Sequence, residues 1–239
     1  AYDQVVHDVA IQNLHVVFCL DRGGVVGADG PTHHGAYDMA YMRCIPNMVV
    51  AAPMDEVELR NMMYTASEKQ SGPFSIRYPR GTGTTVNWRQ PFQAIQIGQG
   101  RKLKSGDDVA ILSIGAIGSQ ATEAIATLEG KGISTAHYDM RFVKPLDEVM
   151  LHEIFGKFRA VVTVEDGCLM GGFGSAVTEF MGDNGYQANM KRLGLGDHYV
   201  EHGTQAQLYA ENGYDAAAIA DAAEELVAAS SSSSRNMQS

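Results

Sequence analysis

Cysteine and long apolar runs are what this 239-residue sequence has least of. The three cysteines are odd in number and show no zinc-ligand spacing, so the sequence indicates neither a disulfide framework nor a zinc site. No apolar run reaches the roughly 18 residues that a transmembrane helix needs, and no signal peptide is apparent. We therefore expect a protein of a reducing cytoplasm that has no membrane partner.

Positive charge is also scarce. Lysine and arginine together number 18 against 28 aspartates and glutamates, which gives a net charge of −10 and a pI of about 5.2. General affinity for nucleic acid or for an anionic membrane is therefore not expected, and an anionic substrate would need particular arginines to hold it. Apolar residues make up 45% and charged residues 19% of the chain, which is typical of a globular protein.

The first part of the chain alternates apolar strands with amphipathic helices. The opening helix has no N-cap residue before it, so we expect a fragment of a longer protein.

Residues 15–20 form a continuous apolar run, which predicts a strand buried on both faces. Asp55 with Glu58 predicts a capping box. Short connections predict a parallel βαβαβ block. Its strands are at 15–20, 48–52 and 74–78, and its helices are at 1–12, 36–43 and from 55 onward.

A second block follows residues 81–93, whose glycine, threonine, asparagine and proline predict a linker. Four apolar strands alternate there with helices, which predicts a second doubly wound sheet. The strands are at 109–114, 133–139, 160–165 and 190–195, and the helices are after Gly115 and at 147–158, 172–183 and 215–229. The expected fold class is therefore α/β with two doubly wound sheets. We assign one domain to 1–90, another to 91–229 and a disordered tail to 230–239.

A glycine-rich loop after the first strand gathers polar side chains in one place. Arg22 directly follows the strand, and Asp29, His33 and His34 follow before the next helix begins. Open α/β sheets bind ligands at the carboxyl ends of their strands, which is where this loop starts. We interpret it as an active-site loop.

Two arginines leave neighbouring strand ends. Arg22 follows the first strand and Arg80 follows the third. Guanidinium groups bind phosphate bidentately, so the pair predicts a phosphate clamp. The alternative for Arg22 is an ion pair with Asp21 or Asp29. Arg77 lies three positions before Arg80, and this odd spacing does not place the two side chains on the same face of a strand. We therefore expect Arg77 to serve a salt bridge or an interface instead.

The histidine pair offers one candidate for ligand binding. Consecutive side chains point in different directions, so at most one of His33 and His34 faces a ligand, and His33 is our candidate. Asp29 has three open roles: it orients His33, binds a substrate hydroxyl or caps the turn. The glycine-rich turn at 171–174 lacks the spacing of a dinucleotide fingerprint or a Walker loop, which favours close packing over phosphate binding.

Several segments resemble the thiamine-diphosphate-dependent transketolase superfamily. They are LDRGG at 20–24, GADGPTHHGA at 27–36, RCIPNM at 43–48, IRYPRG at 76–81, and ED at 165–166 followed by MGG at 170–172. More narrowly, they are similar to the branch that condenses pyruvate with D-glyceraldehyde 3-phosphate, with loss of CO₂. The product of that branch, 1-deoxy-D-xylulose 5-phosphate, is a precursor of isoprenoids, thiamine and pyridoxal. The similarity extends to about Leu226.

The resemblance implies a homodimer whose protomer has three α/β domains. This chain resembles the pyrimidine-binding domain without its beginning, followed by the C-terminal domain. The resemblance places the Gly-Asp-Gly motif for diphosphate and Mg²⁺ outside this chain, together with the glutamate that activates the aminopyrimidine ring. The chain is therefore expected to hold no metal and to need the missing N-terminal portion for catalysis.

The resemblance also implies roles for four residues. Arg22 and Arg80 would hold the phosphate of the aldehyde, and His33 and Asp29 would contact the substrate and the covalent intermediate by hydrogen bonds or proton transfer. Three alternatives remain open: a transketolase, the β chain of a 2-oxo-acid dehydrogenase, and a non-enzymatic binding module.

Overall fold

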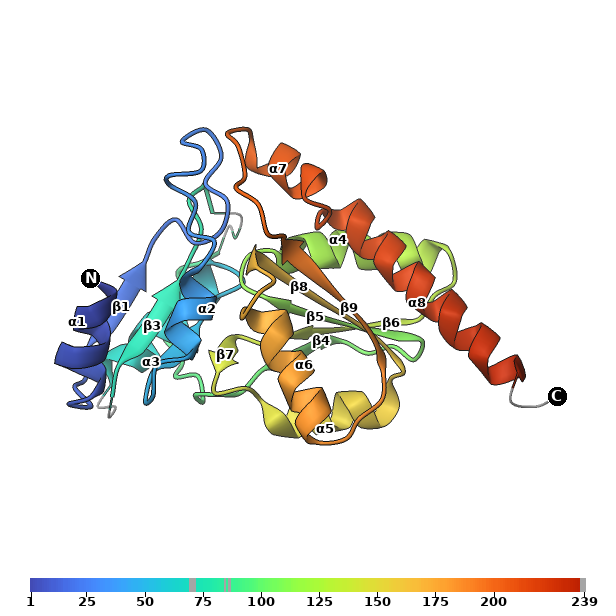
Figure 1. Ribbon diagram of the computed structural model, residues 1–239, viewed down its shortest axis with the longest axis horizontal. Helices are drawn as coiled ribbons and strands as arrows, with labels where there is room; N and C mark the ends of the chain where they lie inside the picture. Colours follow the sequence, from blue (N-terminus) through green and yellow to red (C-terminus); the bar gives the residue numbers. More distant parts are fainter. Residues whose placement is uncertain (69–71, 84, 86, 237–239) are drawn as a thin grey trace.

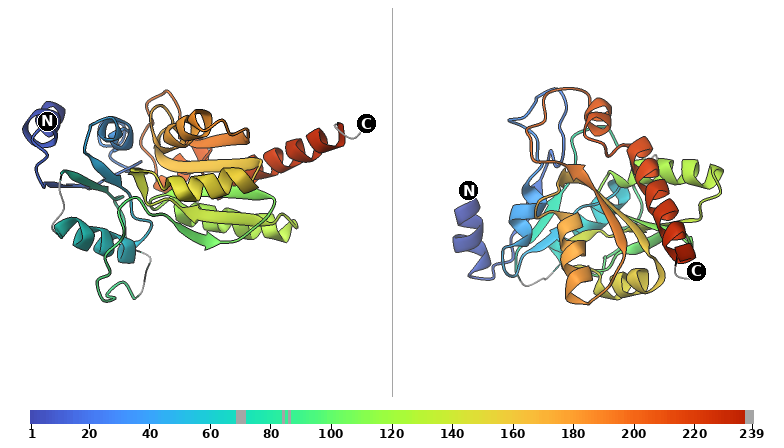
Figure 2. Two further views of the ribbon diagram at one scale, coloured as in Figure 1. Left: turned by 90° about the horizontal axis from the view of Figure 1, so that it is seen from below. Right: turned by 45° about the vertical axis from the view of Figure 1, so that its right-hand side comes forward.

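The computed structural model describes residues 1–68, 72–83, 85 and 87–236 of the chain. They form two sheets that lie side by side, each with helices on both faces (Figures 1 and 2). The expected α/β class with two sheets is therefore confirmed.

The first sheet has the strand order β1-β3-β2-β7. β3 pairs in parallel with both β1 and β2, as the short connections predicted, whereas β7 pairs antiparallel with β2. Helices α2 and α3 lie on opposite faces of this sheet (Figure 2). The elements are β1 (Val17–Leu20), α2 (Asp38–Arg43), β2 (Val49–Ala51), α3 (Glu56–Ser67), β3 (Phe74–Arg77) and β7 (Phe142–Lys144).

Strand β1 lies at an edge of this sheet, which corrects the prediction of a strand buried on both faces. Among the described residues, only β3 pairs with it. Its Phe18 and Leu20 are half-buried, and Cys19 is exposed. An apolar run predicts a strand but does not distinguish an edge position from a central one. The opening helix consists of α1 (Tyr2–Gln4) and a π-helix, η1 (Val5–Ala10).

The second sheet has the order β4-β6-β5-β8-β9. Its strands are parallel except for β4, which runs antiparallel to β6. Helices α4 and α8 cover one face, and α5 and α6 cover the other (Figures 1 and 2). The elements are β4 (Arg101–Lys104), β5 (Val109–Ile114), α4 (Gly118–Gly130), β6 (Thr135–Asp139), α5 (Glu148–Lys157), β8 (Ala160–Cys168), α6 (Phe173–Asp183), β9 (Asn189–Leu195), α7 (Gln205–Glu211) and α8 (Ala216–Asn236).

The start of α3 forms half of the predicted capping box. The Asp55 carboxylate accepts a hydrogen bond from the backbone N–H of Glu58 at 2.9 Å. The buried Glu58 side chain does not return to the cap and instead accepts from Arg141 at 2.6 Å and from Arg101 at 3.1 Å. A buried carboxylate is better compensated by two guanidinium groups than by one backbone N–H, which explains the difference.

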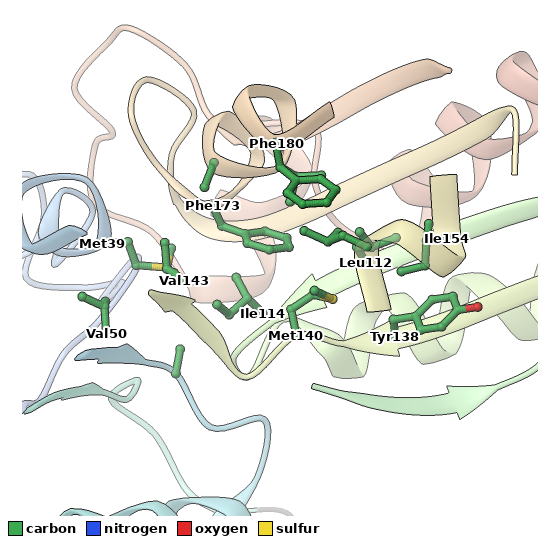
Figure 3. Close-up of a cluster of buried hydrophobic side chains, with 14 of the residues drawn as sticks. Met39, Val50, Leu112, Ile114, Tyr138, Met140, Val143, Ile154, Phe173 and Phe180 are labelled. Atoms are coloured by element: carbon green, nitrogen blue, oxygen red, sulfur yellow. The ribbon is translucent and has the colours of Figure 1, made fainter. Parts of the chain in front are cut away.

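One hydrophobic core is shared by the two halves of the chain (Figure 3). Met39 and Val50 come from the first half, and Ile114, Val143 and Phe173 come from the second. Strand β7 contributes to this continuity because it belongs to the second half by sequence but joins the first sheet. The two sheets are therefore held against each other by buried apolar surface.

Elements β4, β7 and α7 were not predicted. β4 is rich in basic residues and has no buried residue, and β7 is only three residues long, so neither produces a recognisable apolar pattern. Helix α8 continues to Asn236, where the sequence predicted a disordered tail from residue 230. Serine is a moderate helix former, and a helix that is already nucleated propagates at little cost. Residues 237–239 of that tail lie outside the described part of the chain.

Candidate active site

The carboxyl ends of β1 and β3 lie at the same edge of the first sheet. The two strands are direct parallel neighbours, with Leu20 opposite Arg77. Beyond the strands, Tyr78 donates its N–H to the Leu20 carbonyl at 3.0 Å, and Gly23 donates to the Tyr78 carbonyl at 2.9 Å. The predicted parallel pairing of these strands is confirmed, and it brings both carboxyl ends to one edge.

The glycine-rich loop closes on itself beside this edge. Gly24 and Gly35 exchange two backbone hydrogen bonds, each of 2.9 Å. Gly24 has a φ of +83°, and a Cβ added there would lie 1.9 Å from a carboxylate oxygen of Asp166. Only glycine allows this backbone conformation and this close approach. The loop backbone at Gly24 therefore packs directly against the buried Asp166 carboxylate of the second half.

Arg80 and Asp29 are brought together at this edge. The Arg80 Nη1 atom donates to Asp29 Oδ2 at 2.7 Å, and the two side chains are 49% and 38% exposed. Arg22 pairs with Asp21 instead, at 2.6 Å, which is one of the two ion pairs considered for it. Both arginines therefore lie in exposed ion pairs that an incoming anion can compete for.

The two histidines differ in their surroundings. His34 Nδ1 accepts the Val26 N–H at 2.9 Å, so its ring is part of the loop framework. The His33 ring is exposed, and its Nδ1 lies 2.9 Å from the Thr32 hydroxyl. His33 is the more exposed residue of the two, and its role in a site stays a prediction.

A segment of the second half, residues 201–205, lies against the loop and was not predicted to belong to the site. Gly203 donates its N–H to the Gly27 carbonyl at 3.3 Å, and the Glu201 carbonyl lies 3.4 Å from His34 Nε2. No local pattern identifies this segment, because its role depends on a contact across more than 160 positions of sequence.

A cavity of about 500 Å³ adjoins the same edge. Tyr78 and Arg80 line it from the first half, and Ser119, Gln205 and Tyr209 line it from the second. This volume is within the range of small-molecule sites, and its position between two packed units is typical of them.

A buried ion-pair network lies beneath the loop. Arg77, which is 5% exposed, donates to the Asp38 carboxylate at 2.8 Å and to the backbone carbonyls of Gly35 at 3.1 Å and Asp166 at 2.9 Å. Burial acts against the charged form of Arg77, but Asp38 and Asp166 raise its pKa. Of the two roles predicted for Arg77, the salt bridge is confirmed.

The Asp166 carboxylate connects three further elements. Its oxygens accept the Val25 N–H at 3.0 Å and the hydroxyls of Tyr209 and Tyr214 at 3.1 Å each. Burial raises the pKa of Asp166, although these hydrogen bonds and Arg77 act in the opposite direction. Its position after an apolar strand was visible in the sequence, but its partners were not.

The carboxylate of the neighbouring Glu165, a residue of β8, lies at the amino end of α6. Its two oxygens accept the N–H groups of Phe173 and Gly174, both at 2.8 Å. Burial raises the Glu165 pKa to about 7. A Cβ added at Gly172 would lie 2.3 Å from this carboxylate. The glycine-rich turn therefore serves close packing, as its spacing indicated.

The part of the chain that the structure describes contains no group of three or more His, Cys, Asp and Glu residues placed to hold a metal ion. Within the same residues, no helix is both long and apolar enough to cross a membrane.

Two family models match the chain. The transketolase pyrimidine-binding domain matches residues 1–85, and the transketolase C-terminal domain matches residues 98–219. Among similar proteins, the 1-deoxy-D-xylulose-5-phosphate synthase of Cytophaga hutchinsonii is 66% identical over 221 residues, which are 92% of this chain and 35% of that protein. The synthase of the same name from Bacteroides fragilis is 57% identical over 216 residues, which are 90% of this chain and 33% of that protein. The chain thus spans about a third of the length of these relatives and matches their C-terminal portion.

Two solved structures share the fold. A split-gene transketolase, described as an inactive beta4 tetramer, has a TM-score of 0.81 and 29% identity, covering 95% of this chain and 71% of that one. A transketolase mutant from Pichia stipitis has a TM-score of 0.69 over 92% of this chain and 31% of that one. At 19% identity, the second similarity bears on the fold alone.

Proposed function

This chain belongs to the transketolase family, and from that premise we propose that it is the C-terminal part of a thiamine-diphosphate-dependent synthase. The synthase condenses pyruvate with D-glyceraldehyde 3-phosphate, releases CO₂ and forms 1-deoxy-D-xylulose 5-phosphate. The two relatives described above carry that name and support this choice over a transketolase or a 2-oxo-acid dehydrogenase β chain. It is a cytoplasmic enzyme of isoprenoid and thiamine biosynthesis.

The observation that carries the proposal is the position of Arg80. Its half-exposed guanidinium lies at the carboxyl edge of the first sheet, beside a cavity of about 500 Å³. In a chain with a net charge of −10, a phosphorylated substrate needs such a local cation. Arg80 binds the phosphate of the aldehyde through its fork of N–H donors, and Arg22 adds a second cation from the neighbouring strand end.

Asp29 and His33 act on the part of the substrate that reacts. Asp29 pairs with Arg80 before the substrate arrives, gives up this ion pair when the substrate phosphate binds, and then accepts hydrogen bonds from substrate hydroxyls. His33, with its exposed ring, donates a proton to or accepts one from the oxygen atoms of the substrate and the intermediate.

The remaining two thirds of the synthase complete the site. That N-terminal portion supplies the motif for the diphosphate and Mg²⁺ and the glutamate that activates the aminopyrimidine ring. Thiamine diphosphate provides the electron sink for decarboxylation when it is bound. The complete protein is a homodimer.

The test is reconstitution. The chain is assayed by itself and within the full-length polypeptide, with thiamine diphosphate, Mg²⁺, pyruvate and D-glyceraldehyde 3-phosphate. We expect turnover of pyruvate and the triose phosphate only in the full-length protein. Turnover by the isolated 239-residue chain would contradict the proposed division of the site. A full-length protein that accepts only ketose-phosphate donors would identify a transketolase, and one without any turnover would favour a binding module.

A further inference from the structure

Gln205, the first residue of α7, hydrogen-bonds to both loops of the candidate site. Its Nε2 atom donates to the backbone carbonyl of Val25 at 2.9 Å and to that of Arg80 at 3.2 Å. A primary amide has two N–H groups, so a single side chain can serve both acceptors. The two carbonyls belong to segments that lie far apart in the sequence and carry different functional groups.

A shift of either carbonyl would move a residue that is proposed to contact the substrate. Val25 is part of the glycine-rich loop that leads to Asp29, and Arg80 carries the guanidinium that pairs with Asp29. The hydrogen bonds of Gln205 therefore hold the main chain on both sides of the Arg80–Asp29 pair.

The base of Gln205 is itself firmly held. Thr204 and Gln207 form a complete capping box at the start of α7. Leu208 is buried, and Tyr209 donates its hydroxyl to the buried Asp166 carboxylate. The amide is consequently presented from a fixed helix end and not from a mobile loop.

We infer that Gln205 is a positioning residue for the phosphate subsite, supplied by the second half of the chain to a site whose charged groups belong to the first. The inference rests on the proposed function for the identity of the ligand. Its action is indirect: the amide carries no charge and fixes the Arg80 main chain relative to the glycine-rich loop.

The test compares Gln205→Glu with Gln207→Glu in the full-length synthase. The first change removes both N–H donors and places a carboxylate against two carbonyl oxygens, with almost no change in shape. The second makes the same chemical change two residues along the same helix. Glutamate is as suitable as glutamine at that position of a capping box, so the control retains the helix start.

Gln205→Glu and the uncharged Gln205→Met are both expected to raise KM for D-glyceraldehyde 3-phosphate roughly ten-fold or more, because a misplaced binding group weakens the contacts it makes. A rise in Gln205→Glu alone would show repulsion of the phosphate by the new carboxylate and would overturn the positioning role. KM for unphosphorylated D-glyceraldehyde should change little. A merely structural role would lower kcat for both aldehydes equally through loss of folded enzyme. Gln207→Glu should leave all constants near those of the unchanged enzyme.

Hydrogen–deuterium exchange supplies a readout that does not depend on activity. Peptides that span 23–35 and 79–83 should exchange faster in Gln205→Glu than in the control variant. Unchanged exchange, or equal losses for the two aldehydes, would overturn the positioning role. If the unchanged synthase does not discriminate between the two aldehydes, the phosphate role of the site fails, while the exchange data still decide whether Gln205 holds the loops.

Discussion

The Arg80 guanidinium donates to the Asp29 carboxylate across 2.7 Å, which joins two residues 51 positions apart. The pair lies at the carboxyl edge of the first sheet and is about half exposed. A substrate phosphate that binds Arg80 therefore competes with Asp29 for the same cation. Substitutions of Arg80 and of Asp29 should therefore have opposite effects on phosphate binding.

Arg80→Ala should weaken the use of the phosphorylated aldehyde and leave pyruvate binding nearly intact. Loss of a charge-assisted phosphate contact costs roughly 1.5–3 kcal/mol, or on the order of ten- to a hundred-fold in kcat/KM. Arg80→Lys should recover only part of this, since an ammonium group cannot make the forked contact. The measurement is kcat/KM for phosphorylated and unphosphorylated glyceraldehyde in the full-length synthase. Equal losses for both would rule out the phosphate role, and exposed Arg159→Ala is the control.

Asp29→Asn should strengthen anion binding at Arg80 and reduce turnover. An exposed ion pair contributes about 0.2–1 kcal/mol, so removal of the competing carboxylate should lower the inhibition constant of inorganic phosphate by about 1.4- to five-fold. Turnover should fall because the proposed contacts to substrate hydroxyls are lost. Inhibition by phosphate and kcat are measured on the same preparation. A weaker inhibition by phosphate would show that Asp29 supports Arg80 and does not compete with the anion.

Arg77→Met should destabilise the fold strongly. The change leaves the Asp38 carboxylate, 2.8 Å from Arg77 in the native protein, buried without its guanidinium partner. Removal of one member of a buried pair costs about 3–5 kcal/mol. Denaturant unfolding should show this loss, whereas Arg22→Met, which removes an exposed pair, should cost less than about 1 kcal/mol. Similar losses for the two variants would contradict the role of the buried network.

His137 should make the protein less stable as the pH falls. Burial, assisted by Arg101, lowers its pKa from 6.5 to about 4, and its ring is hydrogen-bonded to Ser113 at 2.9 Å. The unfolded chain therefore takes up a proton between pH 6.5 and 4 that the folded chain does not, and stability is lost over that interval. The loss amounts to about 3 kcal/mol.

The measurement is the free energy of unfolding of the unchanged protein minus that of His137→Gln between pH 7 and 4. This difference should fall toward acid pH. Asp139, whose pKa burial raises to about 6, acts in the opposite direction, but it is present in both proteins. A difference that does not vary with pH would refute the assignment. His7→Gln, at an exposed histidine, is the matched control.

Local patterns in the sequence were sufficient to predict most of the secondary structure and to identify the residues at the sheet edge. Apolar runs and helical spacing predicted β1, β3 and α3, and the Asp55 cap, because these features depend on neighbours within a few positions. The short connections predicted parallel strands, which placed Arg22 and Arg80 at one edge. The motifs at 20–36 and 76–81 were enough to indicate the family.

Only the tertiary structure decided which of these residues meet. Asp29 reaches Arg80, Asp38 pairs with Arg77, and Gln205 bonds to the carbonyls of Val25 and Arg80, yet each pair is separated by at least 39 positions. β7 likewise crosses from the second half into the first sheet. Hydrophobic periodicity reports only the environment along one element, whereas these contacts depend on how the two halves pack around their shared core.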